Sequence, residues 1–336
     1  MLFTDEDFEL VVLSLSRMTF LTCKEKFILL NKLDSLHSLS ILSIEDISTI
    51  CERKTKASWD AEFTINSAKR DQKYLSKLGI SWLLYGDARF PRMLEQIADP
   101  PFLLYYRGDI SIMSKPGVSV VGTRKITGES IKACVEFAKD ACRNGVNVIS
   151  GLAFGVDKKA HEGALEAYYE ADDASKVGRT IAVLPGAIDQ IVPYTHRKLA
   201  LDILRSGGLI LSEYPPGVYA EPFRFIERNR IIAGLSEATV VIQAPPGSGA
   251  MLTAEFAVGY DREVMFHKAC FSESSLRISA FEKARLTELA KKNKSDRNKL
   301  KNDPELFVND GAPVIEDYAD FIKCLCEAPG KRGQNG

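Results

Sequence analysis

Five short apolar runs, each ending in a glycine-containing turn, mark the middle of the chain. They are VSVVGTR (118–124), NVISGLAFG (147–155), TIAVLPGA (180–187), LILSEYPPG (209–217) and TVVIQAPPGSG (239–249). Runs of Val, Ile and Leu without polar alternation are typical of strands buried on both faces, as a parallel sheet requires. A segment of helical pattern follows each run, so the repeating unit is strand, glycine turn and helix. The pattern predicts an α/β fold with a doubly wound, mostly parallel sheet.

The turns of this repeating unit are expected to lie together. In a parallel sheet, every turn that follows a strand lies at the carboxyl edge, where doubly wound sheets bind their ligands. The turns contain few residues of the kinds that catalyse reactions, so a composite binding edge is favoured over an active site.

The chain before residue 79 has a different character. It contains glycine-free stretches of helical pattern at 5–18 and 24–33, followed by SIEDIS (43–48), which resembles a capping box and a first helical turn. This predicts a small all-helical domain over 1–78. Residues 79–111 are rich in proline and aromatic residues, and we interpret them as an extended connecting segment, either a flap or edge strands.

The sheet domain is expected over 112–326, with two insertions. The segment 168–178 (YYEADDASKVG) is polar and acidic. Residues 268–301 hold ten Lys or Arg against four Asp or Glu, which is typical of a charged helix or a partly disordered arm. The following residues predict a short strand and a helix that close the edge of the sheet, and the tail at 327–336 is expected to be mobile.

Composition narrows the class of protein only slightly. The 336 residues are 45% hydrophobic and 26% charged with a net charge of −1, which is typical of a globular protein. No apolar run approaches the ~18–20 residues of a membrane span, and the acidic N-terminus is unlike a signal peptide. Seven cysteines without a C-x-x-C pair indicate thiols in a reducing compartment, and Cys324 and Cys326 alone do not favour a metal site. We therefore expect a cytoplasmic protein with no membrane segment and no metal.

Positive charge is concentrated in and just after the glycine turns. It comes from Arg124, Lys125, Arg197, Lys198, Arg224, Arg228 and Arg230. A nearly neutral protein can still present a basic edge to a polyanion, because nearby charges set the local field. The segment FRFIERNR (223–230) combines three arginines with two aromatic residues, which favours binding to a nucleic-acid backbone and its bases. Arg228 could instead pair with Glu227 or Glu255.

Two of the turns have the features of a phosphate site. Gly122-Thr123-Arg124 precedes a helix, so a phosphate could meet backbone N–H groups and the positive helix end while Arg124 grips it bidentately. The turn PGSG (246–249) leads into another helix with the same geometry. Neither turn matches the dinucleotide or P-loop fingerprint. A tight turn with a surface arginine, and a close helix–strand crossing, are the structural alternatives.

Two further helix starts carry polar groups of interest. Asp157 and His161 stand four residues apart, the spacing of a carboxylate that orients an imidazole. Because no nucleophile accompanies them, we interpret Asp157 as a helix N-cap and the pair as a polar contact. The segment PYTHRK (193–198) places Tyr194 near Lys198, which suits an unstacked base beside a phosphate.

The ordered set of motifs resembles the DprA/Smf family of bacterial DNA-processing proteins. The motifs are VVGTR, ISGLAFGVDKKAHEGAL, IAVLPGAID, LILSEYPPG, FIERNRIIAGLS and PPGSGAMLTAEFA, and GDARFPRMLEQIADPPFLLYYRGD upstream is also similar. The resemblance implies an extended Rossmann-like domain, preceded by a sterile-alpha-motif-like helical domain that residues 1–78 fit more loosely. It also implies a non-enzymatic homodimer, without a cofactor, that binds single-stranded DNA and loads the recombinase RecA in natural transformation and recombination.

The resemblance assigns DNA contacts to particular residues. Arg124 falls on the arginine of the family's glycine-serine-arginine turn, with Thr123 in place of serine. Lys198 falls on or beside a lysine that contacts the DNA backbone. The RNR motif matches three residues for which DNA contact and fold support are both open. The expected DNA-binding set is Gly122, Thr123, Arg124, Ser150, Gly151, Gly155, Lys198, Arg228, Asn229, Arg230, Ser248 and Gly249.

The sequence departs from the family after the last core strand. Met265-Phe266 run into His267-Lys268 and the basic insertion where Val-Pro-Gly is usual, which leaves the dimer and recombinase surfaces unassigned. A second hypothesis is an N-glycosidase similar to the nucleoside-monophosphate phosphoribohydrolases, because PPGSGAMLTAE with Glu255 resembles their proline-glycine-glycine turn before a catalytic glutamate. Glu255 lies two residues too far from the glycines for that pattern, so we favour DNA binding.

Overall fold

The computed structural model describes residues 4–327, apart from the side chains of 294–296. Its centre is a nine-stranded sheet in the order β1-β2-β6-β5-β4-β3-β7-β8-β9. The strands are β1 (Ser81–Leu84), β2 (Leu103–Gly108), β3 (Gly117–Gly122), β4 (Asn147–Ser150), β5 (Thr180–Val183), β6 (Leu209–Ser212), β7 (Ala238–Gln243), β8 (Glu263–His267) and β9 (Val314–Ile315). Strands β3 to β9 run parallel, whereas β1 and β2 pair antiparallel at one edge. The predicted α/β fold with a mostly parallel sheet is confirmed, and the tail from 328 lies outside the described residues.

The strand order reverses beside β3. The chain places β4, β5 and β6 in turn on one side of β3, and then returns to place β7, β8 and β9 on the other side. Val118 of β3 is therefore paired with Val148 of β4 on one side and with Ala238 of β7 on the other. Such a reversal leaves a crevice at the carboxyl ends of the two central strands, because the helices that follow them cover opposite faces. The turns after β3 and β7 are thus the best placed to bind a ligand.

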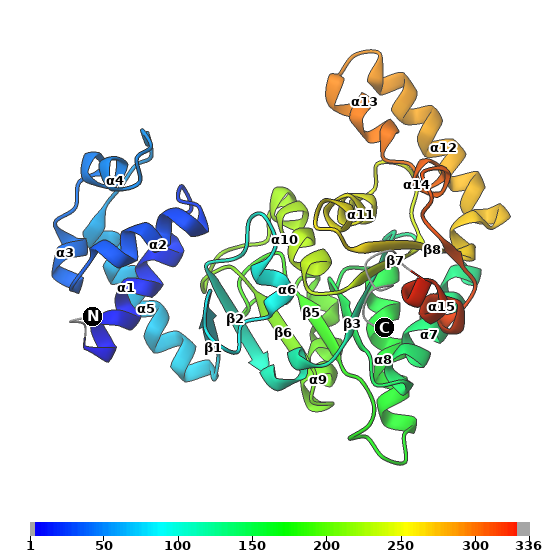
Figure 1. Cartoon of the computed structure of the whole chain (residues 1–336), viewed down its shortest axis with the longest axis horizontal. Coiled ribbons are helices and arrows are strands. Elements are labelled where there is room, and N and C mark those ends of the chain that lie inside the picture. Colours follow the sequence, from blue (N-terminus) through cyan, green and yellow to red (C-terminus); the bar gives the residue numbers. More distant parts are fainter. Residues whose placement is uncertain (1–3, 328–336) are drawn as a thin grey trace.

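Helices cover both faces of the sheet (Figure 1). The described helices, which include the N-terminal unit and a projecting hairpin that do not cover the sheet, are α1 (Asp5–Arg17), α2 (Cys23–Lys32), α3 (Leu36–Ser40), α4 (Ile44–Ile50), α5 (Ala61–Leu78), α6 (Arg92–Glu95), α7 (Gly128–Arg143), α8 (Val156–Glu170), α9 (Arg197–Arg205), α10 (Pro222–Gly234), α11 (Gly249–Gly259), α12 (Glu273–Ala290), α13 (Lys294–Lys301), α14 (Pro304–Asn309) and α15 (Tyr318–Glu327). Val120 lies in the core formed with α7, α8 and α15, and its neighbour Val121 lies in the core formed with α6, α10 and α11. Both faces of β3 are therefore buried, which explains its apolar sequence without alternation.

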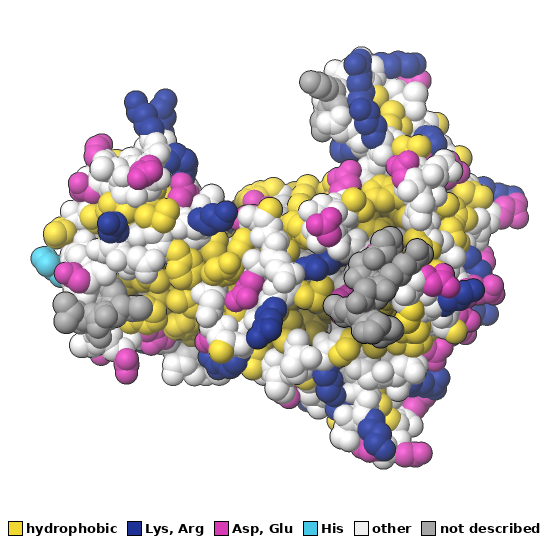
Figure 2. Space-filling model, viewed as in Figure 1, with side chains coloured by type: hydrophobic (Ala, Val, Ile, Leu, Met, Phe, Trp, Pro, Cys, Tyr) yellow, Lys and Arg dark blue, Asp and Glu magenta, His cyan; other side chains and the backbone are white. Residues whose placement is uncertain are grey.

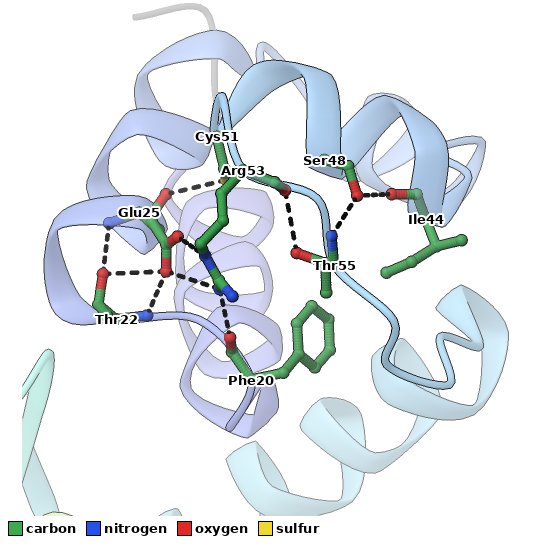
Figure 3. A network of polar contacts seen from close by, with 8 residues as sticks. All are labelled: Phe20, Thr22, Glu25, Ile44, Ser48, Cys51, Arg53 and Thr55. Atoms are coloured by element: carbon green, nitrogen blue, oxygen red, sulfur yellow. Dashed lines mark hydrogen bonds and ion pairs between the residues drawn. The ribbon is translucent and has the colours of Figure 1, made fainter.

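Polar contacts join two segments of the N-terminal helical unit (Figure 3). Thr22 and Glu25 form a capping box at the start of α2, in which the Thr22 N–H donates to the Glu25 carboxylate at 2.7 Å. The same carboxylate pairs with Arg53, which also donates to the backbone oxygen of Phe20 at 2.7 Å. The Arg53 hydrogen bond lowers the pKa of Glu25. This cluster ties the segment after α4 to the start of α2.

The N-terminal helices share a core with the edge of the sheet. Buried apolar residues of α1, α2 and α5 belong to the same cluster as Tyr105 of β2, whose hydroxyl lies 3.0 Å from Ser16 Oγ. Arg17 at the end of α1 donates to the backbone oxygen of Pro216 at 3.0 Å. The segment 79–111 supplies β1 and β2, so it forms edge strands and the sheet starts at Ser81, ahead of the boundary expected at 112.

The two insertions take different forms. The basic segment 268–301 includes α12 and α13, which form a helical hairpin that projects from the sheet domain at the upper right of Figure 1. The acidic segment forms the end of α8 and a loop at 171–178, which leads into β5 and thus lies at the amino edge of the sheet. At the end of the chain, β9 pairs with β8 and α15 packs on the core, as predicted. Within residues 4–327, no helix is both long and apolar enough to cross a membrane.

Candidate nucleic-acid interface

A cavity of about 450 Å³ lies at the carboxyl edge of the sheet, where the strand order reverses. It is lined by the turn after β3, the turn after β7 and part of α10. Of the predicted DNA-binding residues, the lining includes Gly122, Thr123, Arg124, Arg228, Asn229, Ser248 and Gly249. Five others lie outside it, namely Ser150, Gly151, Gly155, Lys198 and Arg230. The fold therefore brings together three motifs that are far apart in the sequence.

Arg124 is an exposed cation that lines this cavity. It follows β3 in the predicted glycine turn, and its guanidinium carbon lies 4.9 Å from the centre of the Phe225 ring on α10. A guanidinium over an aromatic face is attracted by the ring and keeps its N–H groups available at its edge. The arrangement therefore holds Arg124 at the cavity mouth in a position to donate to an anion.

The turn after β7 presents the N-terminus of α11 to the same cavity. Ser248 is the N-cap of this helix, and its hydroxyl is buried without a hydrogen-bond partner among residues 4–327. At Gly249, a Cβ would meet no atom within 4 Å among the described residues, apart from the adjacent residues and the backbone of its own helix. A helix N-terminus with an open approach and an unpaired hydroxyl has the donors that a phosphate requires.

Arg228 lines the cavity from its buried side. Only 3% of the residue is exposed, and its Nη1 donates to the backbone oxygen of Val183 at the end of β5 at 2.6 Å. Burial lowers the pKa of Arg228 to about 10, so the guanidinium is still charged at neutral pH. Burial also raises the pKa of the neighbouring Asp157 carboxyl, an effect that the Arg228 charge partly offsets. Arg228 thus adds positive charge from below while it holds the end of β5.

The three residues of the RNR motif each hold a different strand end. Beside Arg228 and its bond to β5, Asn229 donates through Nδ2 to the backbone oxygen of Gly249 after β7 at 3.0 Å. Arg230 pairs with Glu213 after β6, and burial raises the pKa of Glu213. Helix α10 therefore ties together the carboxyl ends of β5, β6 and β7. The burial of these residues favours fold support, one of the two roles that the sequence left open.

A second group of exposed side chains lies along the same edge, after β4 and β5. Lys198 is exposed in the first turn of α9. Tyr194 is 69% exposed, and the guanidinium carbon of Arg197 lies 3.9 Å from the centre of its ring. The buried His196 donates through Nδ1 to the backbone oxygen of Leu152, in the turn after β4, at 2.8 Å, and its ring packs on Phe154, which is 49% exposed. Exposed rings beside cations suit unstacked bases and their phosphates.

Three of the predicted residues have packing or hydrogen-bonding roles. Gly155 has a φ of +77°, and a Cβ there would lie 2.1 Å from the backbone oxygen of Thr123, because the start of α8 packs on the turn after β3. A Cβ on Gly151 would overlap the Arg228 guanidinium, with 1.8 Å to its Nη1. Ser150 is buried, and its hydroxyl donates to the backbone of β3 at 2.7 Å. Their place in the binding edge is therefore beneath its surface.

The candidate catalytic groups are not assembled into an active site. His161 is fully buried, and its Nδ1 lies 2.6 Å from Thr180 Oγ1. The N-cap of α8 is Gly155, so the predicted cap at Asp157 is wrong. Glu255 is exposed on α11 and does not line the cavity, which does not favour the glycosidase hypothesis. Within residues 4–327, no group of three or more His, Cys, Asp or Glu is arranged to hold a metal ion.

The sequence did not identify Gln243, which supports the turn beside the cavity, or Lys299, which lines it. Gln243 at the end of β7 accepts the N–H of Thr123 with its backbone oxygen at 2.7 Å, and the N–H of Thr127 with its side-chain oxygen at 3.0 Å. Lys299 of α13 lines the cavity. Neither belongs to a recognisable motif, since Gln243 ends an apolar strand and Lys299 lies among many charged residues. Only the fold reveals their position.

The sequence matches the model of the family described as DNA recombination-mediator protein A over residues 81–294. This range includes every glycine turn of the carboxyl edge and the RNR motif of α10. The chain belongs to this family. The predicted DprA/Smf resemblance is thereby confirmed.

Relatives of the chain include proteins named Protein Smf and DNA processing protein DprA. Protein Smf of Borreliella burgdorferi is 31% identical over 260 residues, which cover 77% of this chain and 79% of the relative. Protein Smf of Synechocystis is 41% identical over 53% of this chain and 43% of its own length. DNA processing protein DprA of Bacillus subtilis is 35% identical over 55% of this chain and 60% of its own length. The chain thus matches about half of the length of these last two relatives.

Solved structures of two family members share the fold. DNA processing protein A of Streptococcus pneumoniae has a TM-score of 0.67 and 25% identity, and the match covers 96% of this chain and 98% of that one. The Helicobacter pylori protein, whose structure was described for its single-stranded DNA binding mode, has a TM-score of 0.56 and 27% identity over 74% of this chain and 96% of its own. Because the first match covers nearly the whole chain, it includes the N-terminal helices together with the Rossmann-like sheet.

Proposed function

We propose that the chain binds single-stranded DNA along the carboxyl edge of its sheet, without enzymatic activity, and acts in DNA processing during natural transformation and recombination. The observation that carries the proposal is the cavity in which the exposed Arg124 meets the N-terminus of α11. An arginine beside the N–H groups of a helix start provides what a phosphate requires. Membership of the family, and the Helicobacter pylori relative described for its single-stranded DNA binding, support DNA as the source of that phosphate.

The proposed contacts form two groups along the edge. Arg124 binds one phosphate at the cavity, with Phe225 beneath it, and Lys198 binds another near the exposed ring of Tyr194. Arg228 and Arg230 act from below by holding the turns in place. The phosphate is the same at every nucleotide, and any base can stack on an aromatic ring. We therefore expect the protein to show little preference for particular DNA sequences.

The wider role rests on the family resemblance. We propose that the protein loads RecA on single-stranded DNA, forms a homodimer and is cytoplasmic. Light scattering at micromolar protein tests the assembly, because a 37.2 kDa species alone would contradict the homodimer.

The test of DNA binding is a titration of single-stranded DNA across a series of salt concentrations. Arg124→Gln and Lys198→Gln are each expected to weaken binding roughly tenfold, since each removes a charge-assisted contact. Each should also reduce the slope of log affinity against log salt by about 0.7, because one fewer counterion is released. Different base sequences should be affected alike.

A matched control removes the same charge at the other edge of the sheet. Lys176 lies in the 171–178 loop with 83% of its side chain exposed, and Lys176→Gln should leave both affinity and salt slope unchanged. Wild-type affinity in the folded double variant at positions 124 and 198 would rule out the proposed edge.

A further inference from the structure

The positive charge of the inserted hairpin is concentrated in one part of it. Helix α12 has three basic and three acidic residues, and pairs such as Arg277–Glu273 and Arg285–Glu282 neutralise it locally. The segment 291–301 (KKNKSDRNKLK), which includes α13, has six Lys or Arg and a single Asp. Figure 2 shows dark blue side chains gathered over the tip of the projecting hairpin. The basic excess therefore belongs to α13 and the turn before it.

The base of α13 is held against the turn after β7. The N–H of Gly247 donates to the backbone oxygen of Asn302 at 2.8 Å, immediately after the last residue of α13. The approach is close, because a Cβ on Gly247 would lie 2.7 Å from Lys299 Cβ. Lys283 of α12 pairs with the buried Asp303 at 2.8 Å, and this pair fixes α12 at the same place. The hairpin is thus anchored at the candidate site.

This anchoring brings Lys299 to the DNA-binding cavity. Lys299 lines the cavity with Arg124, Ser248 and Gly249, although it comes from an insertion outside the strand–turn–helix repeats. The residue is exposed on α13, on the side that lines the cavity. A flexible lysine acts as a point charge and needs no fixed geometry to bind a phosphate.

We propose that Lys299 is an additional phosphate-binding residue for single-stranded DNA, and that the basic segment 291–301 extends the binding edge beyond the β7 turn. The inference rests on the proposed function, because it assigns a further contact to the same site. The cation adjacent to the α11 N-terminus lowers the energy of a phosphate there, and the other basic residues of the segment raise the local concentration of the polyanion. At low ionic strength this field extends further, since the screening length increases as salt falls.

The experiment compares substitutions on the two helices of the hairpin. Lys299→Gln is expected to weaken single-stranded DNA binding severalfold and to reduce the salt slope by about 0.7, as for any lost phosphate contact on a single strand. Lys299→Arg retains the charge and should keep the wild-type slope. Arg277→Gln removes a charge from α12 at a position that does not line the cavity, and it should change neither quantity.

The outcomes separate this inference from the proposed function. If the wild type does not bind single-stranded DNA, the proposed function itself is wrong. If the wild type binds and Arg124→Gln weakens binding, but Lys299→Gln has the wild-type affinity and slope, only the role of Lys299 is overturned. An equal loss with Arg277→Gln would also overturn it, because the effect would then come from the overall charge of the hairpin. Circular dichroism of each variant verifies that the hairpin is folded.

Discussion

At the scale of single residues, arginines that look equivalent in the sequence have different roles in the fold. Arg124 is exposed over an aromatic ring at the cavity, whereas Arg228 is buried and bonded to a strand end. The buried arginine depends on Gly151, since any side chain at 151 would occupy the space of its guanidinium. Within one arginine-rich edge, Arg124 is therefore placed for contact with a ligand, whereas Arg228 supports the fold beneath it.

Two glycines of the binding edge should respond differently to alanine. Gly155→Ala should lower the free energy of unfolding by about 1–3 kcal/mol, because φ is +77° and the methyl would meet the backbone oxygen of Thr123. Gly249→Ala should leave stability unchanged or raise it by up to ~1 kcal/mol, since 249 begins a helix with open space around it. It should nevertheless weaken DNA binding, because the methyl occupies the approach of the phosphate. Urea unfolding and DNA titration measure the two effects.

Gly128→Ala is the control for this pair. Gly128 also begins a helix with open space around it, but it does not line the DNA-binding cavity. It should match Gly249→Ala in stability and the wild type in affinity. Full DNA affinity in Gly249→Ala would show that no phosphate approaches the start of α11.

At the scale of elements, α8 packs on β5 through a buried imidazole. His161 is fully buried against Thr180, and burial lowers the pKa of His161 to about 3, so it is neutral in the folded protein throughout the physiological range. In the unfolded chain it titrates near its ordinary value of 6.5. Between these two values the unfolded state binds the proton and the folded state does not. Acid therefore favours unfolding through this residue.

We expect the free energy of unfolding to fall as pH decreases from about 6.5 towards 3, by up to about 1.4 kcal/mol per pH unit from His161 alone. His161→Gln cannot titrate and can still hydrogen-bond Thr180, so its stability should depend less steeply on pH in this window. Carboxylates contribute equally to both proteins and cancel in the difference. Denaturant unfolding at several pH values measures the free energy of unfolding of both proteins. If this free energy changed equally steeply with pH in the wild type and in His161→Gln, the result would contradict the burial of a neutral imidazole.

At the scale of the whole molecule, the helical unit and the sheet are joined by a continuous core. Apolar side chains of α1, α2 and α5 pack in one cluster with those of β2, β5 and β6, and Arg17 links the end of α1 to Pro216 after β6. Because the interface is apolar, separating the two parts would expose buried surface on both. The N-terminal helices therefore stabilise the edge of the sheet as well as one another.

This shared core predicts a single unfolding transition. The two tryptophans, Trp59 before α5 and Trp82 on β1, report on the two sides of the junction. In the single-tryptophan variants Trp82→Phe and Trp59→Phe, fluorescence and circular dichroism should give coincident urea midpoints within each protein. Arg17→Ala should lower the midpoint of both probes equally. An earlier transition seen by Trp59 alone would mean that the helices unfold independently.

Much of the fold follows from local patterns. The apolar runs 118–121, 147–150, 180–183, 209–212 and 239–243 correspond to strands, because unbroken Val, Ile and Leu sequences suit burial on both faces. The candidate cavity was also predicted in part, since Arg124, Ser248 and Gly249 lie in turns that a parallel sheet places at one edge. The edge strands at 81–84 and 103–108 were one of two interpretations, because short segments rich in proline and aromatic residues lack a periodic pattern.

The properties that depend on neighbours distant in the chain could not be read from local pattern. Nothing in the sequence RNR distinguishes a surface arginine from a buried one; the difference arises because Arg228 enters the space left by Gly151 and reaches Val183. Nor does the composition of the insertion reveal that Lys299 lies at the cavity, since its position depends on the contact between Gly247 and Asn302. Secondary structure and the shared edge follow from short-range hydrophobic periodicity and chain topology. The burial and charge environment of a side chain are set by long-range packing, which exists only once the chain has folded.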